Sequence, residues 1–336
     1  MKMKAVGFKK SLPIEEENSF IEFETEQPRP EPKDILVRIQ AVSVNPVDYK
    51  IRQSAAKEAL DTPKIIGWDA AGIVEDVGAE VTMFQKGDEV WYSGDLTRPG
   101  CNAEYQVVDE RLVSLKPKNL NWQEAAAMPL TTLTAWECIF DRMHISRDSG
   151  EDKNILIIGG AGGVGSIAIQ LLKKLTKLEV IATASRKETA DWCKEIGADK
   201  VVNHYELDKE LPEENSIDYI LNFADTSGHW ENMARLIAPE GAISCVVNTT
   251  KKVDLNLLKN KSVSFHWELM FTRPKFQTSS RIRQHEILDE TRKLFESGQL
   301  KTTLEKHFEG LKAETFKEVH KLQESGESIG KNVIVF

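Results

Sequence analysis

The first third of the chain alternates short apolar stretches with turn residues. Stretches rich in Val, Ile and Trp lie at Ile35–Val44, Ala70–Gly78 and Gly87–Gly94, each bounded by Pro, Gly or Asp. Such runs are typical of β-strands. The pattern changes at Asn121, an N-cap residue followed three positions later by Glu and then by good helix formers. We therefore expect a β-rich region and then a helix.

From Asn154 onward, apolar strand patterns and amphipathic helical patterns take turns. Strand patterns lie at 154–160, 178–185, 200–204, 217–224 and 241–250, with helical patterns between them that include Lys187–Ala198 and His229–Pro239. This alternation favours a parallel sheet with crossover helices. A charged helical stretch, Ser279–Ser297, precedes the apolar segment Gly330–Phe336, which we expect to return to the first domain.

The length of 336 residues fits two medium domains better than one small core. We predict a first domain at residues 1–123, completed by residues 267–336, and a second domain at residues 124–266. The predicted fold class is α/β, with a β-rich domain beside a doubly wound parallel sheet.

Charge and cysteine content narrow the function. The net charge is −9 and the Lys and Arg residues are interspersed with acids, which argues against nucleic acid as a partner. No apolar run approaches the roughly 20 residues of a membrane helix, so we expect a soluble, cytoplasmic protein. The four cysteines form no CxxC pair and are expected to be reduced structural thiols.

A glycine-rich loop follows the strand pattern at Asn154. It contains a G-x-G-x-x-G sequence between an apolar strand and an apolar helix, which is the context of a dinucleotide-binding loop. Gly160 would make the sharp turn, Gly162 would admit a pyrophosphate, and Gly165 would let helix and strand pack closely. The alternative is a glycine turn without a ligand. The predicted cofactor-binding loop comprises Gly160, Ala161, Gly162, Gly163, Val164 and Gly165.

The end of the next strand pattern favours NADP(H) over NAD(H). About 20 residues after the glycines, where NAD enzymes place an acid on the ribose, the chain has Ser185, Arg186 and Lys187. A guanidinium and a hydroxyl match a 2′-phosphate. The alternative is that Arg186 and Lys187 are solvated residues that open a helix.

With these features together, the chain resembles the medium-chain dehydrogenase/reductase superfamily, and within it the zinc-independent quinone oxidoreductases. The resemblance implies a GroES-like domain built from both chain ends, an inserted Rossmann domain, an active-site cleft where the two meet, and a homodimer. The stretches that carry it are Ser43–Arg52, Pro63–Gly78, Gly87–Val90, Ala125–Glu137, Gly159–Gly165 and Gly330–Val335.

The same resemblance argues against zinc. Zinc alcohol dehydrogenases carry a Cys near the position of Asn45, and a His in a Gly-His-Glu motif where this chain has Trp68. An indole cannot ligate zinc and an amide is a poor substitute for a thiolate. Only Cys101 lies in the region where the superfamily's four structural-zinc cysteines occur. We expect neither metal site.

The resemblance also assigns site residues. It implies that Asn45 reaches the nicotinamide ribose or the substrate oxygen, that Asp48 orients Asn45 or relays a proton, and that Thr131 contacts the nicotinamide portion. The alternatives are local turn chemistry for Asn45 and Asp48 and a helix N-cap for Thr131. The further implied cofactor contacts are His204 or Tyr205 at the adenine, Phe223, Asn248, and Lys331 at the 2′-phosphate.

Without a metal ion as Lewis acid, the reaction that remains available is hydride transfer to an acceptor that its own carbonyl group activates, such as a quinone or a conjugated enone. The sequence therefore predicts an NADPH-dependent reductase of a quinone or similar conjugated carbonyl. The alternatives are an alkenal or enone double-bond reductase and a non-catalytic NADPH-binding sensor. The enoyl-thioester reductases of the superfamily carry a tyrosine shortly after the segment that corresponds to residues 45–48, and residues 51–59 of this chain contain none.

Overall fold

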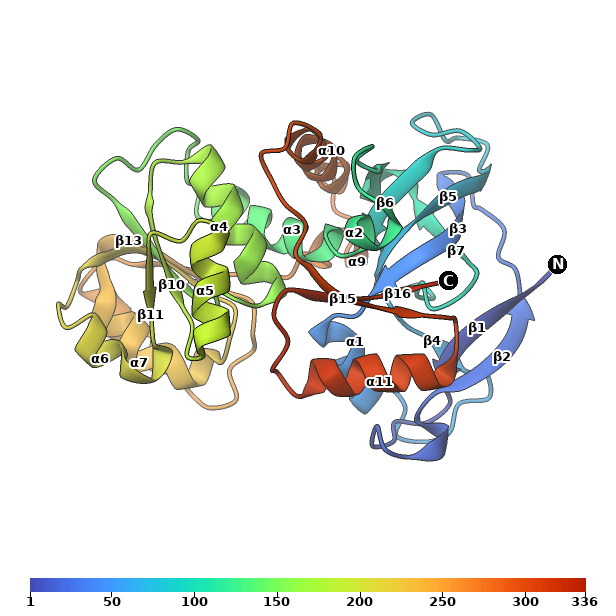
Figure 1. Cartoon of the computed structure of the whole chain (residues 1–336), viewed down its shortest axis with the longest axis horizontal. Helices are drawn as coiled ribbons and strands as arrows, with labels where there is room; N and C mark the ends of the chain where they lie inside the picture. The colour runs from blue at the N-terminus through green and yellow to red at the C-terminus, as the bar shows by residue number, and fades with distance from the viewer. The chain divides into compact units, whose positions relative to one another are not determined.

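The computed structural model describes all 336 residues, and the chain divides into two compact units (Figure 1). The first comprises Met1–Leu130 and Phe271–Phe336, and the second comprises Thr131–Met270. Both boundaries lie a few residues beyond the predicted ones. The reason at the first boundary is that α2 (Trp122–Ala126), within which the predicted boundary falls, packs as a whole on strands of the first unit.

The first unit contains a large, mostly antiparallel sheet. Its strand order is β15-β16-β3-β5-β6-β8, and β7 pairs with β3. A smaller sheet has the order β2-β1-β4. The strands are β1 (Lys2–Phe8), β2 (Ile21–Glu26), β3 (Asp34–Ser43), β4 (Lys64–Ile65), β5 (Asp69–Val77), β6 (Glu89–Ser93), β7 (Tyr105–Asp109), β8 (Val113–Leu115), β15 (Leu304–Glu309) and β16 (Lys331–Val335).

Strand β16 joins the two ends of the chain within this unit. It pairs antiparallel with β3, with Val333 opposite Ser43 and Val335 opposite Ala41. The apolar segment near the C-terminus therefore lies in the sheet of the first unit. The helices of this unit are α1 (Pro46–Ser54), α2, α9 (Thr272–Lys275), α10 (Arg283–Glu296) and α11 (Ala313–Glu324), with short 3₁₀ turns at Glu17–Ser19 and Glu110–Leu112.

The second unit is built on a six-stranded parallel sheet with the order β11-β10-β9-β12-β13-β14. In chain order this is the 3-2-1-4-5-6 arrangement of a dinucleotide-binding sheet. The expected α/β fold is confirmed. The strands are β9 (Asn154–Ile158), β10 (Glu179–Thr183), β11 (Lys200–Val202), β12 (Ile217–Asn222), β13 (Ile237–Cys245) and β14 (Ser264–Trp267).

The helices of the second unit cover the sheet. Helices α4 and α5 contact β9, β10 and β11, whereas α7 buries Trp230 and Met233 against residues of β9, β12 and β13. The helices are α4 (Gly163–Leu175), α5 (Lys187–Glu195), α6 (Leu207–Glu210), α7 (Thr226–Leu236) and α8 (Asn256–Lys259), with a π-helix at Glu137–Arg142 and a 3₁₀ turn at His204–Glu206. Helix α3 (Pro129–Trp136) spans the first boundary.

Local sequence signals account for several element ends. Asn121 and Glu124 cap α2 reciprocally, with side-chain to backbone hydrogen bonds of 2.9 Å in both directions. Helix α7 ends at Leu236, before the predicted end at Pro239, because the residues that precede a proline favour an extended backbone. No helix has the length and apolar character needed to cross a membrane.

Candidate functional site

The glycine loop of the second unit connects β9 to α4. Its left-handed residue is Gly159, with φ of +88°, so the sharp turn lies one residue before the predicted position at Gly160. A Cβ on Gly160 would instead lie 2.8 Å from the Cβ of Ala182, which shows that this glycine is needed for packing against β10. A Cβ on Gly165 would lie 2.2 Å from the carbonyl oxygen of Gly159, so Gly165 keeps helix and loop in close contact.

Gly162 faces open space. The nearest atom to a Cβ built on it is the Gly159 oxygen at 3.6 Å, so no protein atom fills that position. Gly162 is also the N-cap of the 13-residue helix α4 and has no side chain to cap it. The first amides of a helix have no partner within the helix and carry its positive dipole end. The loop therefore has the form of an anion-binding helix N-terminus.

The segment after β10 lies against this loop. Thr183 accepts the Gly159 amide on Oγ1 at 3.0 Å and the Gly160 amide on its carbonyl at 3.2 Å. Ser185 and Arg186 follow directly and are exposed, and Arg186 is the N-cap residue of α5. A hydroxyl and a guanidinium thus follow the carboxyl end of β10, beside the strand β9 that leads into the glycine loop, and no acid is present at these two positions.

The other residues predicted to contact the cofactor are distributed over the second unit. His204 is half-buried, and its ring centroid is 4.0 Å from that of Tyr205 and 5.9 Å from that of His229. Burial lowers the pKa of His204 below its usual value. Phe223 follows β12 and the exposed Asn248 follows β13, both at the carboxyl edge of the sheet.

Thr131 is buried in the first turn of α3, which begins at Pro129. Since the helix already includes Thr131, the N-cap alternative for this residue is wrong.

A buried polar cluster lies in the first unit. It consists of Asn45, Asp48, Asp69 and Lys331, none more than 3% exposed; we call it the buried cluster. Asn45 precedes Pro46 at the start of α1, and its backbone amide donates to Asp48 Oδ2 at 2.7 Å. Asp69 opens β5 and Lys331 opens β16, so the two strands and the start of α1 bring together residues distant in the chain.

Asn45 is held on all sides by this cluster. Its Nδ2 donates to Asp69 Oδ2 at 3.1 Å and to the Ser43 carbonyl at 3.3 Å, and its Oδ1 accepts from Lys331 Nζ. Lys331 Nζ also donates to the Val44 carbonyl at 3.2 Å and lies 3.4 Å from Asp69 Oδ2. The side chain of Asn45 therefore has no proton left for a ligand in this arrangement, and Lys331 has protein partners rather than the implied 2′-phosphate.

Two acids and one cation share this low-dielectric environment. Burial raises the pKa of Asp48 to about 7, against smaller opposing effects of the Asn45 amide and Lys331. Burial also raises the pKa of Asp69, and it lowers the pKa of Lys331 although Asp69 opposes that change. Asp48 Oδ1 is buried without a hydrogen-bond partner. Protonation removes the buried negative charge, and Oδ1 is the oxygen available for the proton because Oδ2 already accepts the Asn45 amide.

Asp69 is the site residue that the sequence reasoning missed. It was read only as part of a motif lacking a zinc ligand, yet it accepts Asn45 on Oδ2 and the Leu130 amide on Oδ1 at 3.1 Å. An acid directly before the apolar residues 70–74 of β5 was the available signal. Tyr92 is buried and donates to Gln106 Oε1 at 2.9 Å, so its proton is already used.

Two family models match parts of this chain. Residues 31–118 match the family model of the alcohol dehydrogenase GroES-like domain, and residues 196–334 match that of the zinc-binding dehydrogenases. A zinc-type alcohol dehydrogenase-like protein of Staphylococcus aureus (strain COL) is 45% identical over 99% of both chains.

Two further relatives have more specific names. The 2-methylene-furan-3-one reductase of Solanum lycopersicum is 37% identical and covers 62% of this chain and 53% of its own length. The quinone oxidoreductase structure from Coxiella burnetii covers 100% of both chains with a TM-score of 0.81 and 26% identity.

The buried cluster does not fit the zinc that some of these names imply. The side-chain amide of Asn45 already uses its hydrogen-bonding atoms within the protein, and Trp68 offers only an indole. Of the two carboxylates, Asp48 accepts the backbone amide of Asn45, and Asp69 lies 3.4 Å from the Lys331 ammonium. A dication there would face a buried positive charge. All four cysteines are buried and unpaired, and no group of three His, Cys, Asp or Glu side chains is arranged to hold a metal ion.

Proposed function

This chain belongs to the medium-chain dehydrogenase/reductase superfamily, and on that premise we propose that it is an NADPH-dependent reductase of quinones or similar conjugated carbonyls that works without zinc. It is an oxidoreductase that acts on small molecules, as the superfamily does. The proposal of a zinc-independent NADPH reductase rests on two features of the chain. The buried cluster does not suit a metal ion, and Ser185 and Arg186 follow the strand next to the glycine loop.

The residues of the second unit fit NADP(H). The open space at Gly162 and the first amides of α4 suit the pyrophosphate, and Ser185 and Arg186 suit the 2′-phosphate. His204 or Tyr205 would contact the adenine, with Phe223 and Asn248 along the same edge of the sheet and Thr131 at the nicotinamide portion. Bound NADPH supplies a hydride to the acceptor.

The first unit provides the groups that manage a proton. Lys331 and Asp69 hold the Asn45 side chain in one orientation, and the Asn45 backbone amide fixes one oxygen of Asp48. Asp48 can then keep a proton on Oδ1 near neutral pH and release it when the acceptor gains negative charge. Asn45 is thus a positioning residue, and Asp48 is the proposed proton source.

A conjugated acceptor suits this set of groups. Reduction of an unactivated carbonyl needs a Lewis acid or a strong donor at the oxygen, whereas a quinone or enone delocalises the charge itself. The quinone reductase and 2-methylene-furan-3-one reductase names of two relatives support the two acceptor types. Reduction of an enone double bond is the second candidate function because the same residues serve it.

We also propose that the protein is a homodimer. Strand β14 forms an edge of the six-stranded sheet and has no neighbour on its outer side. Trp267 and Leu269, in and just after this strand, are 49% and 48% exposed. An unpaired edge with large apolar side chains is suited to pairing with a second chain. Light scattering of the wild type and of Trp267→Glu tests this, since the variant should be monomeric.

The test of the function is NADPH oxidation with a panel of quinones and enones. It is run in parallel with NADH and after exhaustive chelation of metals. We expect turnover with NADPH, much weaker turnover with NADH, and no effect of chelation. Loss of activity on chelation would overturn the zinc-free proposal. Binding of NADPH without turnover of any acceptor would instead support the non-catalytic sensor.

A further inference from the structure

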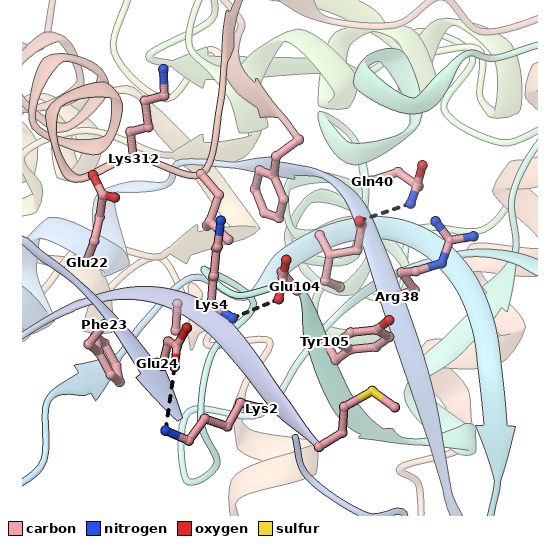
Figure 2. Close-up of a pocket in the computed structure, with 15 residues that line it drawn as sticks. Lys2, Lys4, Glu22, Phe23, Glu24, Arg38, Gln40, Glu104, Tyr105 and Lys312 are labelled. Carbon is pink, nitrogen blue, oxygen red and sulfur yellow. Dashed lines mark hydrogen bonds and ion pairs between the residues drawn. The ribbon is translucent and has the colours of Figure 1, made fainter. Parts of the chain in front are cut away.

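The first unit contains a hollow of about 780 Å³ that the proposed reaction does not use (Figure 2). It is lined by residues of β1, β2, β3 and β7, of the segment before α11, and of the chain end after β16. No residue of the buried cluster lines it. Its volume lies within the range of about 300–1,000 Å³ that small-molecule sites occupy.

The acids around this hollow are already engaged. Glu104 Oε2 accepts the backbone amide of Lys4 at 2.7 Å, and Glu22 Oε1 accepts the amide of Ala313, where α11 begins, at 3.1 Å. Glu24 lies 3.6 Å from the ammonium of Lys2. Each carboxylate in the lining thus has a donor or cation of the protein beside it.

Three basic side chains of the lining have no close partner in the protein. The ammonium groups of Lys4 and Lys312 make no hydrogen bond or ion pair. Arg38 has only a 3.7 Å contact with Glu75, whose carboxylate is bound more closely by Lys86 at 2.7 Å. Figure 2 shows the Lys4 side chain extending toward the middle of the hollow, with Arg38 on one side and Lys312 on the other.

The floor of the hollow is apolar. Ile39 and Ala5 are buried, and Phe23 and Tyr105 are half-buried residues of the lining. The hydroxyl of Tyr105 has no hydrogen-bond partner in the protein. Aromatic and aliphatic walls with a few unsatisfied polar groups are the usual make-up of a ligand site.

We propose that this hollow binds a small aromatic carboxylate. The carboxylate group lies among Lys4, Arg38 and Lys312, and the ring packs on Phe23 and Tyr105. The basic side chains of the lining are Lys2, Lys4, Arg38 and Lys312, and the acidic ones are Glu22, Glu24 and Glu104. Each acid has a donor or cation of the protein beside it, so the hollow favours an anionic ligand. The apolar floor excludes a small inorganic anion, which would leave Ile39, Phe23 and Tyr105 uncovered.

Calorimetric titration of the full chain with 2-naphthoate tests the proposal, with 2-naphthalenemethanol as a neutral ligand of the same shape. We expect the acid to bind at least fivefold more tightly than the alcohol, and this difference to shrink as salt rises. The double variant Lys4→Gln/Lys312→Gln should weaken naphthoate binding by about fivefold or more, the effect of two partly exposed charge contacts. The matched control is Lys9→Gln/Lys10→Gln, which changes two exposed lysines outside the hollow.

The titration is repeated with saturating NADPH, which separates this site from the coenzyme site. Undiminished naphthoate binding supports the proposal whether or not the reductase function holds. Displacement by NADPH would overturn it, and so would equal affinity for acid and alcohol or an unchanged affinity in the Lys4/Lys312 variant. All four lysines are exposed, and equal melting temperatures of the variants confirm that their folding is intact.

Discussion

The substitution Asp48→Asn tests the buried cluster through the dependence of stability on pH. Burial raises the pKa of Asp48 from 3.8 to about 7 in the folded protein, which corresponds to about 4 kcal/mol against the charged carboxylate. Asn has nearly the same shape and no charge, and its amide oxygen can still accept the Asn45 backbone amide. The variant therefore removes the titration and retains the helix cap.

The sign of the effect follows from proton linkage. Between the unfolded pKa of 3.8 and the folded pKa of about 7, the folded protein binds more protons at Asp48 than the unfolded chain does. The contribution of Asp48 to the free energy of unfolding therefore falls as pH rises through this window and levels off above it. From about pH 5 to about pH 7 the loss is about 2 kcal/mol.

Urea unfolding of the wild type and of Asp48→Asn at a series of pH values measures this directly. The free energy of unfolding of the variant minus that of the wild type should rise by about 2 kcal/mol from about pH 5 to about pH 7. Titrating groups that do not interact with Asp48 contribute equally to both proteins and cancel, whereas Lys331 and Asp69 are coupled to Asp48 and form part of the measured difference. Asp61→Asn, at an exposed acid of the same unit, is the control and should show a constant difference.

A constant difference for Asp48→Asn as well would refute the reasoning, because Asp48 would then titrate alike in the folded and unfolded chains. The same variant has a catalytic readout. We expect kcat/KM for a quinone to fall about 100-fold, the usual contribution of a positioned acid, and the wild-type decline above about pH 7 to disappear. An unchanged pH profile would remove Asp48 from the proton path and leave its structural role.

Three further predictions concern the other parts of the site. Arg186→Ala should raise KM for NADPH about tenfold and leave KM for NADH unchanged, since a charged hydrogen bond contributes about 1.5–3 kcal/mol; an equal effect on both coenzymes would contradict the 2′-phosphate assignment. Gly165→Ala should lower the melting temperature because its Cβ would lie 2.2 Å from a backbone oxygen, whereas Gly162→Ala should fold normally and bind NADPH weakly. Lys331→Met should lower the free energy of unfolding by about 3–5 kcal/mol because Asp69 loses its buried counter-charge; an unchanged urea midpoint would show that the pair is not stabilising.

The sequence predicts the fold well wherever the pattern is local. The alternation after Asn154 and the capping pair Asn121 and Glu124 have signals within a few residues, and the structure has the corresponding sheet order and helix start. The domain boundaries were less accurate because packing decides them. The sequence of α2 predicts a helix but does not indicate the domain to which it belongs. Its contacts with β3 and β5 assign it to the first unit.

The candidate site was predictable in its residues and not in their contacts. The glycine loop, Asn45, Asp48 and Lys331 all stand in recognisable sequence contexts. Lys331 reaches Asn45 and Asp69 because β16 pairs with β3. Strands so far apart in the chain leave no periodic pattern in the sequence that would reveal their pairing. The position of the left-handed turn at Gly159 also escaped prediction, because two adjacent glycines are equally able to adopt it.

The pairing of β16 with β3 also sets an order of events during synthesis on the ribosome. Asn45 and Asp69 emerge early, and Lys331 follows Asn45 by 286 residues. At a translation rate of roughly 5–20 residues per second, Lys331 is synthesised about 15–60 seconds after these two residues. Until then the edge of β3 that receives β16 is open and Asp69 has no counter-charge. The nascent chain therefore cannot complete the buried cluster until its last residues emerge, whereas the second unit, whose residues are contiguous, can fold beforehand.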